Sequence, residues 1–163
     1  MKKVLLSVGL LLILVTLTGC EFNFKIGGDE SKANTLLGEK SYECTYSSGD
    51  NKQSGYVIVK NNKLERYVIK RHYVLTDKDQ YDKTCKSYKD TIESLDDNNK
   101  YDLHCDDEKK TIDTLEVYYM STLDERSKSS LSGLLSYVKD DDTFDYEGWM
   151  TSGRNNGYTC QEG

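Results

Sequence analysis

The sequence predicts an α+β fold: an antiparallel β-sheet of about five strands, with helices packed on one face and two disulfides. Three observations lead to this prediction. Segments with the alternating pattern of strands are joined by short turns, and segments with a helical spacing of apolar residues interrupt them. Four cysteines are spread over the same region, between residues 44 and 160. Strands joined by tight turns, with helices between them, are typical of the α+β class.

The first part of the domain predicts three consecutive strands. Tyr42, Cys44 and Tyr46 recur at a period of two, which places them on one face of the first strand. Clusters of serine, glycine, asparagine and aspartate then mark two turns. The predicted strands are residues 42–46, 56–60 and 64–75, and the turns are residues 48–51 and 61–62. Together they predict an antiparallel meander.

A helix is predicted directly after the third strand. Thr76 and Asp79 match the Ser/Thr-x-x-Asp/Glu pattern that opens helices, and two asparagines predict its end near Asp97. One stripe of the helix recurs at spacings of four, three, four and three, while lysine and aspartate cover the other faces. The stripe consists of Tyr81, Cys85, Tyr88, Ile92 and Leu95. Cys85 is therefore expected to point into the core.

The rest of the chain predicts a hairpin, a second helix and a short terminal segment. Residues 101–105 and 111–120 form the hairpin, and Thr122 with Glu125 matches the pattern that opens the helix. The apolar residues of this helix are Leu131, Leu134, Leu135 and Val138. The terminal segment holds Phe144, Tyr146, Trp149 and Met150, and the chain closes with residues 157–160. We expect the Phe144–Trp149 segment to close the core; a docking patch is the alternative.

The amino end predicts a secretory signal peptide. Lys2 and Lys3 form a short basic region, and residues 4–15 are apolar apart from Ser7 and Gly9. This stretch is shorter than the about 20 residues that span a bilayer comfortably. A short membrane anchor that stays attached is the alternative.

Residues 17–20, Leu-Thr-Gly-Cys, resemble the bacterial lipobox. The resemblance implies removal of residues 1–19 and attachment of lipid to Cys20, which holds the protein on the extracytoplasmic face of the cell membrane. Two or three acyl chains give a stable anchor because each buried CH₂ contributes about 0.8 kcal/mol. A chance cysteine at this position is the alternative. Residues 20–40 are then the lipidated cysteine and a flexible tether, and residues 41–163 form a single domain.

The cysteines of the domain predict two disulfides. With Cys20 assigned to lipid, four remain, and an even number in an exported domain is typical of a disulfide framework. No two of them have the Cys-x-x-Cys spacing of a zinc site or a redox motif. Their expected role is therefore to staple the fold, and no metal ligand or cofactor is assigned.

A distance argument favours one pairing of these cysteines. Cys85 lies twelve helical residues before the predicted helix end, which is about 18 Å. Cys105 lies five extended residues into the next strand, which is about 17 Å. If the strand returns beneath the helix, the two sulfur atoms lie at a similar depth. This favours Cys85–Cys105 and leaves Cys44–Cys160 as the second disulfide.

The charge of the mature chain excludes one class of partner. Without the signal peptide, 20 basic residues stand against 28 acidic ones, a formal charge of −8. Binding to nucleic acid depends on lysine and arginine at the phosphates, so no nucleic acid partner is expected. Anionic lipid headgroups repel the chain as well, so the lipid on Cys20 must hold it to the membrane. An envelope protein, a peptide or a sugar remains as a possible ligand.

The sequence contains no recognisable catalytic motif. It lacks a nucleophile elbow, a glycine-rich phosphate loop and a His-Glu-x-x-His pattern. His72 and His104 have no evident nucleophile or metal-ligand partner, and both are expected to be exposed on strands. No catalytic residue is assigned, and we expect a non-enzymatic binding or interaction module. An envelope enzyme, hydrolase-like, with a site that the sequence does not reveal is the alternative.

Two other features have a structural and a functional interpretation. The acidic group of Asp140, Asp141, Asp142, Asp145 and Glu147 offers oxygen ligands for calcium, but it lacks the order of a calcium-binding loop, which favours a solvated loop. The 13 tyrosines can form an aromatic surface for a peptide or a sugar. Strand-forming tyrosines with packed rings and hydrated hydroxyl groups are the favoured explanation.

Two stretches resemble a family of small bacterial lipoproteins typified by YehR. They are Thr-Tyr-Ser-Ser-Gly-Asp-Asn-Lys-Gln, from residue 45, and Thr-Ile-Asp-Thr-Leu-Glu-Val-Tyr-Tyr, from residue 111. The likeness covers roughly Ser41 to Tyr119, with a weaker echo at residues 157–158. The resemblance implies the fold and the location at the cell envelope, and no activity.

Overall fold

The computed structural model describes residues 38–93 and 99–163. The predicted signal peptide, the lipobox with Cys20, most of the predicted tether and the predicted end of the first helix lie outside the described residues. Among the helices that are described, none is long and apolar enough to cross a membrane.

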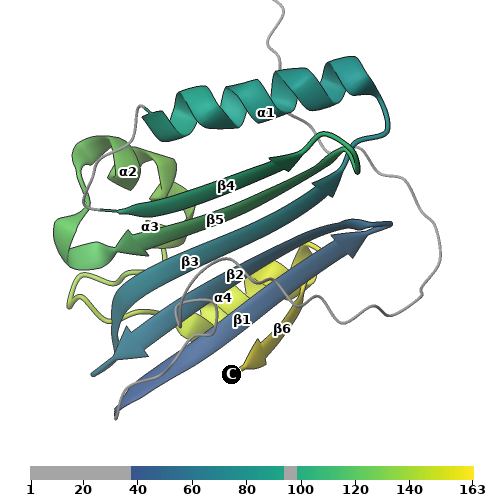
Figure 1. Cartoon of the computed structure of the whole chain (residues 1–163). Helices are drawn as coiled ribbons and strands as arrows, with labels where there is room; N and C mark the ends of the chain where they lie inside the picture. The colour runs from purple at the N-terminus through teal and green to yellow at the C-terminus, as the bar shows by residue number, and fades with distance from the viewer. Residues whose placement is uncertain (1–37, 94–98) are drawn as a thin grey trace, which may run out of the picture.

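Six antiparallel strands form one sheet, in the order β4-β5-β3-β2-β1-β6 (Figure 1). The strands are β1 (Glu39–Ser48), β2 (Asn51–Lys60), β3 (Lys63–Val74), β4 (Lys100–Asp106), β5 (Thr111–Tyr119) and β6 (Thr159–Glu162). The α+β class with an antiparallel sheet and two disulfides is confirmed, with six strands rather than about five. The additional strand is β6, which pairs with β1 so that Cys160 lies opposite Cys44.

Local turn chemistry fixes the meander of β1, β2 and β3. Asn61 and Asn62 form the two-residue loop between Lys60 and Lys63, with φ values of 51° and 63°. Two consecutive residues with positive φ match the twist of a tight hairpin, and asparagine tolerates this conformation better than most residues. Gly49, with φ of 58°, supplies the same freedom in the turn before β2.

The helices are short apart from the first. They are α1 (Lys78–Glu93), η2 (Met120–Thr122), α2 (Glu125–Ser130), α3 (Ser132–Leu135) and α4 (Tyr146–Asn155). The single helix expected after Thr122 is instead the pair α2 and α3. Leu131, with φ of −94° and ψ of 11°, departs from helical geometry between them.

Aspartates rather than the predicted threonines cap two of these helices. The Asp77 carboxylate accepts a hydrogen bond from the Gln80 backbone N–H at 2.7 Å, one residue after Thr76. The Asp124 carboxylate likewise accepts from the Ser127 N–H at 2.6 Å. Aspartate satisfies the free N–H groups at a helix start as well as threonine does, so a spacing pattern alone does not choose between neighbouring candidates.

The described helices pack on one face of the sheet. In Figure 1, α4 lies behind β1 and β2, and α1 runs along β4. We call this helix-covered face the helix-side face. Its buried residues include Tyr42, Val57, Ile69, Tyr81, Ile112, Tyr118, Leu131, Leu134 and Phe144. The opposite face carries a smaller apolar cluster formed by Ile58, Val68, Leu115 and Val117. Both faces of the central strands are therefore apolar, and the helix side holds most of the core.

The two disulfides lie near opposite edges of the sheet. Cys85–Cys105 joins α1 to β4 with a Cα separation of 6.3 Å, and Cys44–Cys160 joins β1 to β6 with a separation of 4.1 Å. These are the pairs that the distance argument favours. The second bridge closes 116 residues of sequence, so it joins the start of the described domain to its end.

Candidate binding cleft

A cleft of about 660 Å³ opens on the helix-side face, between the strands β1 and β2 and the helices α3 and α4. We call it the aromatic cleft, because five of its lining residues are aromatic. Its lining residues are Cys44, Tyr46, Gln53, Gly55, Tyr67, Gly133, Leu134, Tyr137, Trp149, Ser152, Gly153, Asn156 and Tyr158. Clefts of about 300–1,000 Å³ are typical of sites for small ligands.

The aromatic rings reach the cleft from separate elements. Tyr46 comes from β1 and Tyr67 from β3, whereas Trp149 comes from α4 and Tyr158 from the loop before β6. The rings of Tyr46 and Tyr158 lie 5.3 Å apart, tilted by 44°. All four side chains are partly exposed, so their ring surfaces are accessible to a ligand while their backbones belong to a fixed scaffold.

The orientation of Trp149 depends on the core beneath it. Its ring lies 6.5 Å from that of Phe144, which is 4% exposed and belongs to the core cluster. The Asp145 carboxylate caps α4 by accepting a hydrogen bond from the Gly148 N–H at 3.0 Å. The segment that holds Phe144 and Trp149 therefore closes the core with one ring and lines the cleft with the other.

Two glycines allow close packing in the lining of the cleft. A Cβ atom at Gly55 would lie 2.9 Å from the Tyr67 hydroxyl oxygen, so the missing side chain makes room for that ring over β2. A Cβ atom at Gly153 would lie 2.7 Å from the Cys160 sulfur and 3.0 Å from the Cys44 sulfur. Glycine at position 153 thus allows α4 to lie directly on the disulfide.

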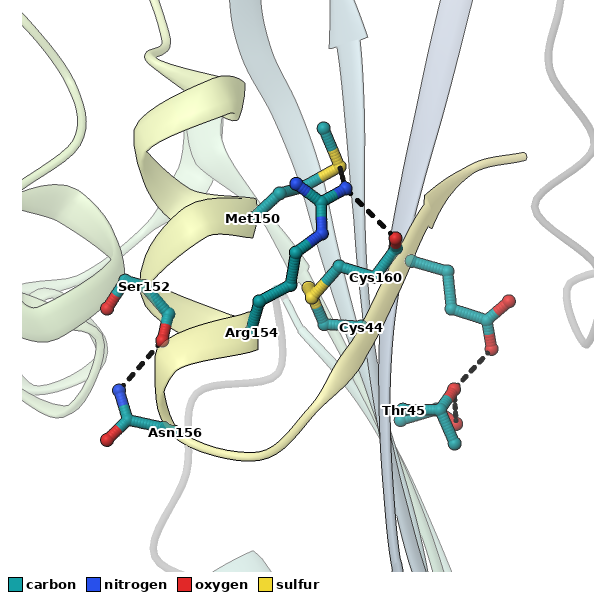
Figure 2. Close-up of a disulfide and its surroundings, with 9 residues drawn as sticks. Cys44, Thr45, Met150, Ser152, Arg154, Asn156 and Cys160 are labelled. Atoms are coloured by element: carbon teal, nitrogen blue, oxygen red, sulfur yellow. Dashed lines mark hydrogen bonds between the residues drawn. A yellow bond between two sulfur atoms is a disulfide. The ribbon is translucent and has the colours of Figure 1, made fainter.

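The end of α4 is held to β6 by polar contacts around the same disulfide, as Figure 2 shows. The Arg154 guanidinium donates a hydrogen bond to the Cys160 carbonyl at 3.1 Å. The Asn156 amide donates to the Ser152 carbonyl at 2.8 Å, which fixes the amide beside the cleft. The Arg154 hydrogen bond thus links the end of α4 to β6, while the Asn156 hydrogen bond closes the last turn of α4 itself.

The lining of the cleft carries no charged side chain. It contains no aspartate, glutamate, lysine, arginine or histidine, and its polar groups are amides, hydroxyls and backbone. Burial raises the pKa of Tyr67 to about 12, and burial also raises the pKa of Tyr158, although the nearby Arg71 opposes both shifts. Both phenols are therefore neutral near pH 7. The arrangement provides aromatic faces and neutral hydrogen-bonding groups, which suit binding rather than acid–base catalysis.

An ion pair lies on the same face next to these tyrosines. The Arg71 guanidinium contacts the Glu116 carboxylate, and the Tyr118 hydroxyl donates a hydrogen bond to the same carboxylate at 2.8 Å. The charges of Arg71 and Glu116 are paired with each other, so neither is left uncompensated beside the cleft.

Both histidines, His72 and His104, lie on the face of the sheet opposite the helix-side face. His104 is exposed and points away from the Cys105 disulfide, as expected. His72, however, is half-buried, with its Nδ1 atom 2.6 Å from the Asp113 carboxylate, so the expectation of an exposed histidine is wrong there. The sequence does not reveal this partner because strand register, which places Asp113 opposite His72, is not visible in it.

The acidic residues of the predicted calcium-binding group have local structural contacts. Asp142 pairs with Lys63 at 3.2 Å, Asp141 accepts from the Thr143 hydroxyl at 2.6 Å, and Asp145 caps α4. Within residues 38–93 and 99–163, no three histidine, cysteine, aspartate or glutamate side chains come together as a metal site.

The sequence identified the cleft only in part. An aromatic surface was only the alternative interpretation of the tyrosines and of the Phe144–Trp149 segment, and Tyr46, Tyr67, Tyr158 and Trp149 do line the cleft. It did not indicate Gln53, Ser152 or Asn156, or the two glycines described above. These residues carry no motif, since they come together only through the strand register and the position of α4.

Comparison with known proteins gives the chain no family. No family model matches it, and neither does any curated protein. A solved NMR structure of a protein from Streptococcus pneumoniae TIGR4 is similar, with 15% sequence identity and a TM-score of 0.47. That likeness covers 95% of this chain and 100% of the other.

Proposed function

We propose that this protein is a lipid-anchored binding module at the outer side of a bacterial cytoplasmic membrane, and that the aromatic cleft binds its ligand. The observation that carries the proposal is the cleft itself: accessible aromatic rings and neutral polar groups in a volume typical of ligand sites. The lipobox at residues 17–20 and the YehR-like stretches support the location at the envelope.

The anchor limits where the cleft operates. Eighteen residues lie between Cys20 and Glu39, the first residue of β1. A fully extended chain spans at most about 3.6 Å per residue, so the domain stays within about 65 Å of the bilayer. The ligand is therefore a component of the cell envelope or a solute that reaches its surface.

The residues of the cleft favour binding over catalysis. A hydrolase needs a nucleophile or an activated water beside a base, and the cleft lining offers no histidine, carboxylate or free thiol, since Cys44 is in a disulfide. The His72–Asp113 pair, which would be the natural base of the alternative enzyme, lies on the opposite face of the sheet.

Site-specific photo-crosslinking in cells tests the proposal. Benzoylphenylalanine replaces Tyr137 in the cleft or, as a control, Gln80, which is exposed on α1. We expect the full-length, lipid-anchored protein to form a light-dependent adduct from position 137 and none from position 80. An adduct from both positions, or from neither, would contradict the proposal.

A further inference from the structure

We propose that the ligand of the aromatic cleft is a neutral oligosaccharide. This inference rests on the proposed function and specifies its ligand class. It follows from three properties of the cleft: the absence of charged side chains in its lining, its partly exposed aromatic rings, and the strand pairing of the backbone in its floor.

The lining excludes ligands that carry a net charge in the bound segment. Burying an ionic group without a counter-charge is costly, and sites for phosphates or carboxylates accordingly supply arginine, lysine or a helix N-terminus. Charged side chains are missing from this lining, and the nearby Arg71 is paired with Glu116, while Arg154 donates to the Cys160 carbonyl. A neutral ligand is therefore favoured.

The aromatic rings and the amides match the two sides of a sugar ring. A pyranose presents a flat patch of C–H groups and, at its edges, hydroxyl groups that both donate and accept hydrogen bonds. Tyrosine and tryptophan combine a large apolar face with a polar tip. Tyr46, Tyr158 and Trp149 supply such faces, while the amide groups of Gln53 and Asn156 both donate and accept.

The strand pairing in the floor disfavours an extended peptide. Peptides in extended conformation are commonly recognised by adding a strand to an exposed sheet edge, through main-chain hydrogen bonds. The floor consists of β1 and β2 at Cys44 and Gly55, which pair with each other, and Cys44 pairs with Cys160 on its other side. The backbone of the floor is thus already used within the sheet.

The chain carries its own reporter for this ligand. Trp149 is the only tryptophan in the sequence and lines the cleft, so its fluorescence reports on occupancy without any label. The experiment titrates the full-length, lipidated protein in detergent micelles with three neutral probes. They are N,N′,N″-triacetylchitotriose, maltotriose and trialanine with blocked ends.

We expect a saturable change of Trp149 fluorescence with at least one of the two saccharides and none with the blocked peptide. Gln53→Ala removes one hydrogen-bonding side chain and should weaken saccharide binding about fivefold. Tyr158→Ala removes a stacking face and should weaken it about tenfold. Gln80→Ala, the same substitution on exposed α1, should leave the affinity unchanged.

The outcomes separate this inference from the proposed function. Binding of the blocked peptide without binding of either saccharide overturns the saccharide assignment and leaves the cleft as a binding site. Saccharide binding that Gln53→Ala and Gln80→Ala affect equally overturns the assignment to this cleft. No response to any probe overturns the saccharide assignment, and the crosslinking result at position 137 then decides the proposed function independently.

Discussion

Each edge of the helix-side face has a helix beside a disulfide, but the two edges are packed differently. At the β4 edge, α1 is bridged to β4 by Cys85–Cys105, and Tyr81 and Ile112 fill the space between helix and sheet, being 1% and 0% exposed. At the β6 edge, α4 lies on the Cys44–Cys160 bridge, yet about 660 Å³ beside it stays open. The presence of a disulfide beside a helix therefore does not decide whether a cleft forms there.

The difference comes from the residues placed between helix and sheet. At the β4 edge the Tyr81 ring fills the interface, whereas at the β6 edge the Tyr67 ring and the disulfide occupy the positions next to Gly55 and Gly153, and the cleft opens beside them. A cleft of this size lined by partly exposed rings is typical of a site for a small ligand. Comparing the two edges by mutation tests this interpretation.

The largest expected effect is the loss of a disulfide. In the chain-entropy model, the loop of Cys44–Cys160 corresponds to about 5 kcal/mol and that of Cys85–Cys105 to about 3 kcal/mol. We expect the double variant Cys44→Ala/Cys160→Ala to lower the free energy of unfolding more than Cys85→Ala/Cys105→Ala, as measured by urea denaturation. A larger loss at the β4 edge would show that strain or local packing, not loop length, determines the stabilisation.

The second prediction compares the loss of stability at a residue buried at the β4 edge with that at a residue lining the aromatic cleft. Ile112→Ala should lower the free energy of unfolding by about 3–4 kcal/mol, because it leaves a cavity in a fully buried position. Gln53→Ala should change it by no more than about 0.5 kcal/mol, as for other partly exposed polar residues. If Gln53→Ala destabilised the fold as strongly as Ile112→Ala, the residue would serve packing and not ligand binding.

A third comparison uses two glycines that both line the cleft. Gly153→Ala should destabilise the protein by about 1–3 kcal/mol, since the new methyl group meets the disulfide sulfur atoms. Gly133→Ala in α3 has no heavy atom within 4 Å of the new Cβ and should stabilise the protein by about 0.5–1 kcal/mol. Thermal unfolding of both variants measures the difference, and equal effects would place α4 farther from the bridge than described.

The smallest effect concerns alkaline pH. Burial raises the pKa of Tyr67 in the cleft and of Tyr81 at the β4 edge to about 12, above the ordinary value of 10. Because the folded state favours the neutral phenol, this stability is fully present below pH 10 and is lost as pH rises towards 12. Urea midpoints at pH 9 and 11.5 should fall less in Tyr67→Phe and in Tyr81→Phe than in the unmodified protein. An unchanged fall in Tyr67→Phe would mean that the cleft leaves this hydroxyl hydrated.

Sequence reasoning succeeded where the signal is local. Alternation in the strands, the helical stripe through Tyr81 and Cys85, and the parity of the cysteines depend on residues close in the chain or on counting. It failed for the pairing of β6 with β1 and for Asp113 beside His72, which depend on strand register. The cleft lies between these cases, since its aromatic residues are visible in the sequence, whereas the close contacts at Gly55 and Gly153 depend on where Tyr67 and α4 pack.

The most direct test of the central claim is to locate a bound saccharide by NMR. The ¹⁵N-labelled, lipidated protein in micelles is titrated with triacetylchitotriose and, separately, with maltotriose. We predict shifts of the Trp149 indole N–H and of the Gly55 and Gly153 amides with at least one saccharide, and none at Ile112 at the β4 edge. Shifts centred on Ile112, shifts on the opposite face of the sheet, or no shifts with either saccharide would contradict the account.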